Sequence, residues 1–191
     1  IILRDGKFNI LGFIDKKKTK KINGYKILGN DSFLYNKKID CSHIVIAVTE
    51  FKKRLDIYNK LSKLNYKFPN IIDPSVKIDN NVRFQEGIVI GMNSVILNKV
   101  SIGNLSIIGT SVNILHDTKI GKNCLIGGGT IVGANVTLKN NIYVGVGSIF
   151  ASKKIIVGNE CFISSGSVVL KSLKSRSKVI GNPAKVISLN E

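Results

Sequence analysis

A six-residue period runs through the chain from residue 72 onward, and it restricts the possible folds more than any other feature. At fourteen consecutive sixth positions the residue is Ile, Val, Leu or Phe. At the abundance of these residue types in this chain, such a run is on the order of one in a million by chance. The anchor positions are Ile72, Ile78, Phe84, Ile90, Ile96, Ile102, Ile108, Ile114, Ile120, Ile126, Val132, Leu138, Val144 and Phe150.

The residues between the anchors repeat as well. The fourth residue after an anchor is small or β-branched, and the residue directly after it is often glycine, which would relax the backbone where it bends. Each unit therefore predicts a short strand and a corner, with the anchor pointing inward onto the next coil. Three units make a triangular coil of about 18 residues, so residues 72–174 are predicted to form a β-solenoid of about five and a half coils. The period slips by one residue near Lys153 and Lys154 and resumes at Val157.

The first 70 residues follow a different pattern, typical of an α/β fold. Apolar runs at Phe8–Ile14 and Ile44–Val48 predict buried strands, and apolar residues at helical spacing predict a helix over Lys52–Leu64. Strand, helix and strand in this order indicate a Rossmann-like unit. Its opening strand and Gly-rich turn are missing, Ile1–Arg4 look like the end of its first helix, and the chain does not begin with Met. We expect a small, N-terminally truncated domain over residues 1–70 and a solenoid with a C-terminal extension over residues 71–191.

The net charge of +17 indicates anionic partners such as nucleotides or coenzyme A. Nucleic acid is disfavoured, because the one dense basic cluster, Lys16–Lys18 with Lys20 and Lys21, lacks the interleaved aromatic residues on which bases stack. Three cysteines without a CxxC pair predict free thiols and a reducing, cytoplasmic location. The apolar stretches are shorter than the roughly 20 residues of a membrane helix, and no signal peptide is expected.

Only two histidines are available for catalysis, and His116 is the stronger candidate. It follows the anchor Ile114 by two places, which predicts a corner or outward position, and Asp117 beside it can orient the imidazole and raise its basicity. The competing interpretation is an ordinary surface histidine. We interpret His43 as structural and Cys124, at a fourth position, as interior packing. A zinc site like that of the γ-class carbonic anhydrases is disfavoured, because it needs three histidines and the solenoid has one.

The repeats, the segment Ile114–Asp117 and the segment Gly181–Lys185 together resemble the bacterial hexapeptide-repeat acetyltransferases that include sialic acid O-acetyltransferases and UDP-4-amino-sugar N-acetyltransferases. The segments Gly12–Asp15, Gly24–Gly29 and Ile44–Val48 are similar to that family's sugar-nucleotide domain. The resemblance covers essentially the whole chain. It implies a left-handed parallel β-helix, and a homotrimer with active sites between neighbouring subunits. It also implies transfer of an acetyl group from acetyl-CoA to an amino sugar nucleotide or sialic acid, in surface glycan biosynthesis.

The resemblance implies roles for individual residues. His116 matches the general base, Asp117 the acidic residue that raises its basicity, and Asp15 a residue at the nucleotide-sugar site. We expect backbone N–H groups near Gly133 and Ala134 to stabilise the oxyanion, and we expect no metal to take part. The positions that match contacts with coenzyme A are Ala134, Val146 and Ser165.

Two residues depart from the family pattern. Leu125 stands where a second histidine is usual, and Gly109 stands where an asparagine is usual. These two departures and the absence of the Gly-rich turn leave a second hypothesis open. In it the protein is a catalytically inactive solenoid that serves as a scaffold or binds a nucleotide sugar. A third hypothesis, nucleic-acid binding, rests on charge alone. Neither the pattern nor the charge decides between N- and O-acetylation.

Overall fold

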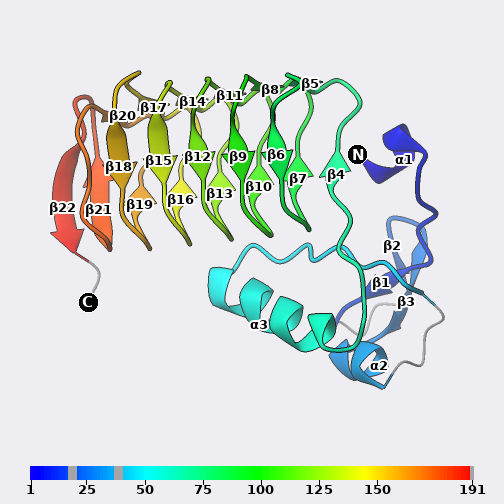
Figure 1. Cartoon of the computed structure of the whole chain (residues 1–191). Coiled ribbons are helices and arrows are strands. Elements are labelled where there is room, and N and C mark those ends of the chain that lie inside the picture. Colours follow the sequence, from blue (N-terminus) through cyan, green and yellow to red (C-terminus); the bar gives the residue numbers. More distant parts are fainter. Residues whose placement is uncertain (17–20, 37–40, 190–191) are drawn as a thin grey trace.

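The computed structural model describes residues 1–16, 21–36 and 41–189, so Lys17, Lys18 and Lys20 of the basic cluster lie outside the described residues. Two parts follow one another along the chain (Figure 1). The first is a small α/β part, and the second is a long stack of parallel coils. Each part has a hydrophobic core of its own.

The N-terminal part combines three short strands with three helices in the described residues. Strand β3 is central, parallel to β1 on one side and antiparallel to β2 on the other. Asn23 and Gly24 join β2 to β3 with positive φ angles of 46° and 83°, the backbone of a tight hairpin turn. The elements are α1 (Ile2–Asp5), β1 (Phe13–Ile14), β2 (Lys21–Ile22), β3 (Tyr25–Gly29), α2 (Asp31–Tyr35) and α3 (Phe51–Ser62).

The structure corrects the Rossmann-like prediction in part. Helices are found where they were expected, α1 at the start of the chain and α3 close to the predicted bounds. The run Ile44–Val48, however, forms no strand, and its pairing is limited to a bridge between His43 and Lys67. Of the predicted strand Phe8–Ile14 only the last two residues are in β1. The three-stranded sheet is therefore mixed, because its third strand comes from the β2–β3 hairpin and not from a strand–helix–strand crossover.

From residue 71 the chain winds into a three-sided parallel β-helix, which confirms the predicted triangular coils. The chain passes in turn through three sheets, called here the first, second and third sheets. The first corner leads from the first to the second sheet, the second corner from the second to the third, and the third corner back to the first. Partner residues lie 18 apart through most of the stack, as in the pair Ile108 and Ile126.

The bounds of the strands follow the six-residue period. The first sheet contains β4 (Ile71–Ile72), β7 (Val89–Ile90), β10 (Ile107–Ile108), β13 (Leu125–Ile126), β16 (Tyr143–Val144), β19 (Phe162–Ile163), β21 (Ser177–Ile180) and β22 (Lys185–Leu189). The second contains β5 (Lys77–Ile78), β8 (Val95–Ile96), β11 (Asn113–Ile114), β14 (Ile131–Val132), β17 (Ile149–Phe150) and β20 (Val168–Val169). The third contains β6 (Arg83–Phe84), β9 (Ser101–Ile102), β12 (Lys119–Ile120), β15 (Val136–Leu138) and β18 (Ile155–Val157).

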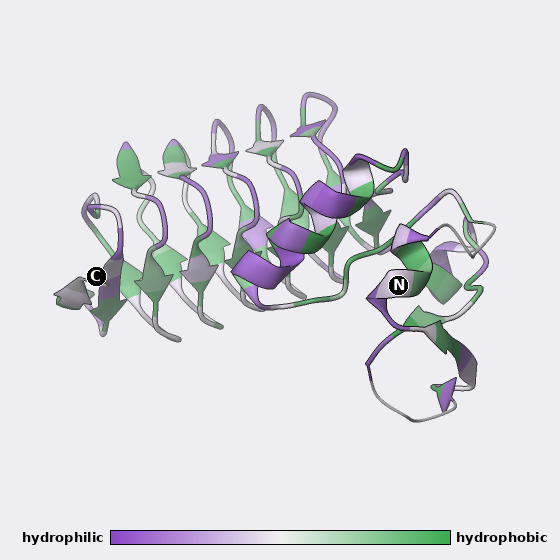
Figure 2. Cartoon of the chain, turned by 90° about the horizontal axis from the view of Figure 1, so that it is seen from below, coloured by the Kyte–Doolittle hydropathy of each residue, from purple (hydrophilic) through white to green (hydrophobic). Residues whose placement is uncertain are grey.

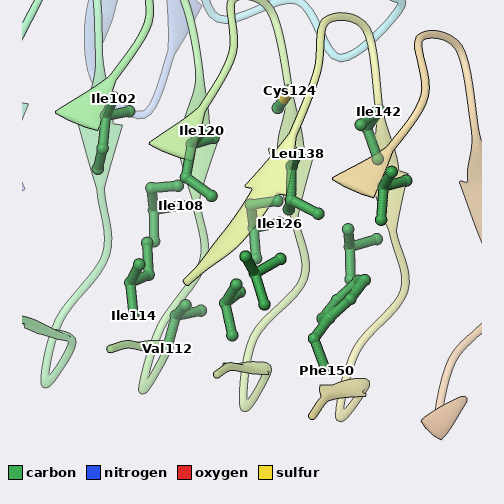
Figure 3. Packing of buried hydrophobic residues seen from close by; sticks show 14 of the residues in the cluster. Ile102, Ile108, Val112, Ile114, Ile120, Cys124, Ile126, Leu138, Ile142 and Phe150 are labelled. Atoms are coloured by element: carbon green, nitrogen blue, oxygen red, sulfur yellow. The ribbon is translucent and has the colours of Figure 1, made fainter. Parts of the chain in front are cut away.

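The anchors fill the interior of the β-helix (Figure 3). From Ile90 to Phe150 every anchor is at most 3% exposed, while Ile72, Ile78 and Phe84 in the first coil are less covered. From Ile88 to Ser148 the fourth-position residues are buried too, and where they carry hydroxyls these are hydrogen-bonded inside the stack, as when Thr118 Oγ1 donates to the carbonyl oxygen of Gly133 at 2.9 Å. A buried hydroxyl therefore costs little here, because its hydrogen bond is made inside the stack.

The structure explains the glycines that follow the anchors differently from the sequence-based prediction. A Cβ on Gly121 would lie 2.4 Å from the carbonyl oxygen of Lys139 in the next coil, so glycine permits the close approach of neighbouring coils. The sharp bend comes two residues later, at the third position after the anchor, where the backbone is left-handed with φ between 54° and 61°. The non-glycine residues at these bends are Asn93, Lys99, Leu105, Ser111, Asp117, Asn123, Asn135 and Asn141.

The predicted slip of the period is confirmed at the second corner of a late coil. Leu138 pairs with Val157, 19 residues later, while Ile155 and Val157 remain buried. The one extra residue is thus taken up by the exposed turn at Lys153 and Lys154, and the interior stack continues. The C-terminal extension forms β22, which pairs antiparallel with β21 and ends the first sheet.

Helix α3 runs along the third corner of the β-helix, with polar residues on much of its surface (Figures 1 and 2). Arg54 of α3 is only 1% exposed, and its Nε donates to Asn123 Oδ1 at 2.7 Å while Nη2 donates to the Asn123 carbonyl oxygen at 3.1 Å. Its Nη1 donates to the carbonyl oxygens of Val48 and Thr49 at 2.9 and 3.1 Å. Arg54 therefore joins the N-terminal part to a bend of the third corner.

Candidate active site

His116 and Asp117 lie on the second corner, between β11 and β12, which agrees with the corner position expected for His116. Their side chains are 55% and 42% exposed, and His116 Nδ1 lies 2.8 Å from Asp117 Oδ2. The left-handed backbone of Asp117, with φ of 59°, brings its carboxylate back toward the preceding residue. When Nδ1–H donates to the carboxylate, Nε2 is left as the acceptor. The pair can then take a proton at Nε2 from a group that arrives from solvent.

The 18-residue repeat places a column of outward-facing residues on the second corner, with His116 in its middle. The main chain links successive coils there: Asp117 N–H donates to the Asn98 carbonyl oxygen, and Asn135 N–H donates to the His116 carbonyl oxygen, both at 3.1 Å. Neighbouring coils are about 4.8 Å apart, the spacing of paired strands. The asparagines of this column were not among the residues predicted from the sequence, although the 18-residue spacing was the signal that could have found them. In chain order the column is Asn80, Asn98, His116, Ala134 and Ser152.

The three residues expected to contact coenzyme A are divided between two corners. Ala134 stacks one coil above His116 on the second corner and is 6% exposed. Val146, which is 57% exposed, and Ser165 lie on the first corner, where Gly166 N–H donates to the Val146 carbonyl oxygen at 2.9 Å. The second sheet separates the two corners within one chain. The structure thus brings together His116, Asp117 and Ala134, but not Val146 and Ser165.

The oxyanion donors expected near Gly133 and Ala134 are engaged in the β-helix. Gly133 N–H donates to the Phe150 carbonyl oxygen at 3.0 Å, as part of the ladder between coils. Ala134 N–H donates to Ser152 Oγ at 3.2 Å. The expectation is therefore wrong for Gly133, and the Ala134 donor becomes available only when the Ser152 hydroxyl turns away.

Asp15 lies directly after β1 in the N-terminal part, apart from the corner that carries His116 (Figure 1). It is half-buried, and its N–H donates to the Gly29 carbonyl oxygen at 3.0 Å. The next residue, Lys16, borders an open hollow of about 300 Å³. The other residues that line it are Asn30, Asp31 and Ser32.

The two departures from the family pattern lie away from His116 within the chain. Leu125 faces outward from the first sheet, and Gly109 lies on the first corner. A Cβ at position 109 would lie 2.6 Å from the backbone nitrogen of Gly128 in the next coil. Asparagine at this position is therefore incompatible with the present stacking, which gives a physical reason for the glycine.

The surroundings of Cys124 and His43 indicate structural roles for both residues. Cys124 is fully buried, its Sγ contacts the Lys139 carbonyl oxygen at 3.1 Å, and burial raises the pKa of its thiol to about 11. It is therefore a protonated interior residue and no nucleophile. His43 is exposed in the N-terminal part, where its Nδ1 is paired with Ser42 Oγ at 2.8 Å.

Metal-binding groups and membrane-spanning helices are both absent from the described part of the chain. No group of three or more His, Cys, Asp or Glu side chains is placed to hold a metal ion among residues 1–16, 21–36 and 41–189. Over the same residues, no helix is both long and apolar enough to cross a bilayer. The longest of the described helices, α3, has 12 residues.

Two family models match successive parts of the chain. Residues 1–61 match the model of the PglD N-terminal domain. Residues 67–158 match the model of the GMPPB C-terminal domain. The comparison with curated protein sequences gave no match.

Several solved structures are similar over nearly the whole chain. PerB from Caulobacter crescentus, in complex with CoA and GDP-perosamine, is 24% identical, with 93% of this chain and 84% of that chain covered and a TM-score of 0.87. WeeI from Acinetobacter baumannii is 22% identical, with 97% and 91% covered and a TM-score of 0.88. The acetyltransferase domain of PglB from Neisseria gonorrhoeae, in complex with acetyl coenzyme A, is 19% identical, with 97% and 90% covered and a TM-score of 0.75.

These likenesses concern the path of the backbone through both parts of the molecule. They cover 93% of this chain for PerB and 97% for WeeI. The predicted resemblance is thus confirmed at the level of the fold: the chain shares its two-part architecture with the structures of PerB, WeeI and the PglB acetyltransferase domain.

Proposed function

We propose that the protein transfers an acetyl group from acetyl-CoA to the amine of a nucleotide-linked amino sugar, in the biosynthesis of a surface glycan. The observation that carries the proposal is the His116–Asp117 pair, exposed on a corner and joined at 2.8 Å. Similar structures in complex with CoA, acetyl-CoA and GDP-perosamine support the two substrate classes. The net charge of +17 supports them too, because both substrates are polyanions.

In the proposed reaction His116 is the general base. The amine nitrogen attacks the thioester carbonyl carbon, and its proton passes to His116 Nε2 as the C–N bond forms. The C–S bond then breaks, and the departing CoA thiolate recovers a proton from the imidazolium. Asp117 keeps Nδ1 protonated and stabilises the positive charge that the imidazole gains. Holding both substrates at one corner supplies the remaining rate enhancement through proximity.

We expect Asp117→Asn to lower kcat on the order of 10- to 100-fold, a smaller loss than removal of the base itself. Asparagine tolerates the left-handed backbone, but its amide lacks the charge and can donate to Nδ1, which would favour the wrong tautomer. The measurement is the initial rate of CoA thiol release with acetyl-CoA and GDP-perosamine. Asp56→Asn, at an exposed site on α3, is the control and should leave the rate unchanged. An Asp117→Asn enzyme as fast as this control would contradict the role of the carboxylate.

We infer further that the protein is a homotrimer whose second sheets face the threefold axis. The outer face of this sheet carries an apolar stripe, in which Ile131 and Ile149 are 38% and 40% exposed and Val95 and Val168 are half-buried, together with Asn113 and, in the first coil, Lys77. Three copies with this face inward would bury the stripe. The second corner of one subunit would then meet the first corner of the next. His116 would thereby join the Val146 and Ser165 positions of its neighbour, which one chain cannot achieve.

The trimer makes a specific prediction for Ile149. A lysine there would be buried at the axis three times over, so Ile149→Lys should dissociate the protein into monomers, measured as mass by light scattering. The control is Ile156→Lys, because Ile156 is 42% exposed on the outer face of the third sheet and should tolerate the charge. Dissociation by both variants, or by neither, would contradict the assignment of the second sheet to the interface.

The remaining expectations belong to the same proposal. The coils are taken to wind left-handedly, as the sequence resemblance implies, and three free cysteines fit a reducing cytoplasm. Acetyl-CoA would extend from His116 toward the C-terminal coils, since Ala134, Val146 and Ser165 all lie on that side. Asp15 and the hollow beside Lys16 would contribute to the nucleotide site.

Calorimetric titration with acetyl-CoA tests the function most directly. We expect one acetyl-CoA per subunit for the wild type and for His116→Ala, because the base contacts the acetyl end and not the nucleotide end. A second titration with GDP or UDP should show a separate site. An intact trimer that binds no acetyl-CoA would overturn the proposal in favour of an inactive solenoid, the alternative that Leu125 and Gly109 leave open.

A further inference from the structure

A second hollow, of about 250 Å³, lies on the same corner as His116, on the side toward the N-terminal coils. Its walls come from two successive coils, where the chain leaves β5 and β8 for the third sheet. It is open to solvent and adjoins His116 because Asn98 precedes His116 by one coil in the corner column. The lining residues are Ile78, Asp79, Asn80, Asn81 and Asn98.

The polar groups of this hollow are available to a ligand. Asn80, Asn81 and Asn98 are exposed, and within the described ranges their side-chain amides have no hydrogen-bond partner in the protein. Each amide offers two N–H donors and one carbonyl acceptor, and the Asp79 carboxylate adds further acceptors. Ile78, which is 37% exposed, contributes an apolar surface. Amides and a carboxylate around an apolar surface match a pyranose ring, whose hydroxyls need partners while its C–H faces need apolar contact.

The order of the coils fixes which substrate this hollow can serve. Asn98 lies one coil from His116 and Asn80 lies two coils away, which is about 5 and 10 Å at the spacing of paired strands. The residues expected to contact coenzyme A all lie on the opposite side of His116, toward the C-terminus. The N-terminal part adjoins the end of the β-helix that carries the hollow, where Arg4 Nη1 of α1 lies 3.0 Å from Asp73 Oδ2 of the first coil. His116 thus stands between a C-terminal side for the donor and an N-terminal side for the acceptor.

Two cations lie close to the hollow along the chain. Lys99 follows Asn98 on the corner, Arg83 lies on the third sheet two residues after Asn81, and both are exposed. A ligand that continues from the sugar into a diphosphate would find its charge partly neutralised by these cations. A neutral free sugar would gain nothing from them.

We propose, on the basis of the proposed function, that this hollow is the acceptor-sugar subsite, with Asn98 and Asn80 as the side chains that bind the ring hydroxyls. Asn98 binds the part of the ring next to the reacting amine, and Asn80 binds the part nearer the diphosphate. Because both act on the acceptor alone, they determine which sugar is bound and leave the acetyl donor unaffected.

Steady-state kinetics with GDP-perosamine and UDP-linked 4-amino sugars as acceptors test this assignment. One lost hydrogen bond to the acceptor should raise its KM about 5- to 10-fold in Asn98→Ala and in Asn80→Ala. The double variant should raise it on the order of 50-fold, while the Kd of acetyl-CoA stays within about twofold of wild type. Asn59→Ala is the matched control, since Asn59 is an exposed asparagine on α3 far from the corner column, and it should leave both constants unchanged.

The outcomes separate this inference from the proposed function. A wild type that acetylates any of these acceptors, with the KM of the double variant unchanged, would overturn the sugar subsite and leave the acetyltransferase intact. A wild type that binds acetyl-CoA but turns over none of the acceptors would overturn the subsite as a site for nucleotide-linked amino sugars. Failure to bind acetyl-CoA at all would overturn the proposed function first. A rise in acceptor KM confined to Asn98→Ala and Asn80→Ala supports the assignment.

Discussion

Replacing His116 with alanine is expected to lower kcat/KM by about 10²- to 10⁴-fold, the usual contribution of a positioned general base. The physical reason is that the attacking amine must lose a proton as it acylates, and Nε2 of His116 is the acceptor that the Asp117 contact leaves available. The measurement is the initial rate of thiol release from acetyl-CoA with GDP-perosamine as acceptor. Acetyl-CoA affinity, measured by calorimetry, should remain within about threefold of wild type.

The chain supplies its own control for this experiment. His43→Ala removes the other histidine, which is exposed in the N-terminal part and paired with Ser42. Its rate should equal that of the wild type. A His116→Ala enzyme that stays within a few-fold of His43→Ala would remove the imidazole from the mechanism.

The second large effect concerns stability and is expected for Arg54→Met. Methionine retains much of the volume but leaves four acceptors without their donors, the Asn123 side-chain and main-chain oxygens and the carbonyl oxygens of Val48 and Thr49. Because Arg54 and Asn123 are both buried between α3 and the third corner, we expect a loss of about 3 kcal/mol in the free energy of unfolding. Urea denaturation followed by circular dichroism measures it, and hydrogen exchange should show that α3 opens first.

Arg176→Met is the matched control for Arg54. Arg176 also interacts through its Nε, at 3.1 Å from Glu160 Oε2, but both side chains are more than half exposed. Such a surface pair contributes roughly 0–1 kcal/mol, so this variant should unfold close to the wild-type midpoint. Equal losses in the free energy of unfolding for the two substitutions would mean that Arg54 does not stabilise the contact between α3 and the β-helix.

The β-helix could be predicted from the sequence because each anchor repeats the same environment. The anchors from Ile90 to Phe150 are all buried in the structure. It is their regular repetition, and not any one of them, that predicts the fold. The left-handed bends were missed, although five of the eight non-glycine residues there are Asn or Asp, the types that adopt this backbone most readily. The role of the glycines was misjudged, because close approach between coils depends on residues 18 positions away.

The N-terminal part was predicted less well for a different reason. The run Ile44–Val48 is apolar and extended, yet it forms no strand because its neighbours offer it only the bridge between His43 and Lys67. The sequence of a segment indicates its tendency to form a strand, but it does not show whether another strand lies beside it to pair with. The same limit applies to the active site: the pairing of His116 with Asp117 is local and was predicted, whereas the separation of Val146 and Ser165 from it depends on which corner each residue reaches.

The coil with one extra residue at Lys153 and Lys154 has a consequence for how such proteins diversify. The insertion lies on the second corner, and the buried ladder continues past it at Ile155 and Val157. A turn on this edge can therefore lengthen without disturbing the interior, while a change inside a strand would misalign every later rung. Since His116 and its neighbours occupy the same edge, evolution can reshape the surroundings of His116 by adding loop residues there and keep the scaffold as it is.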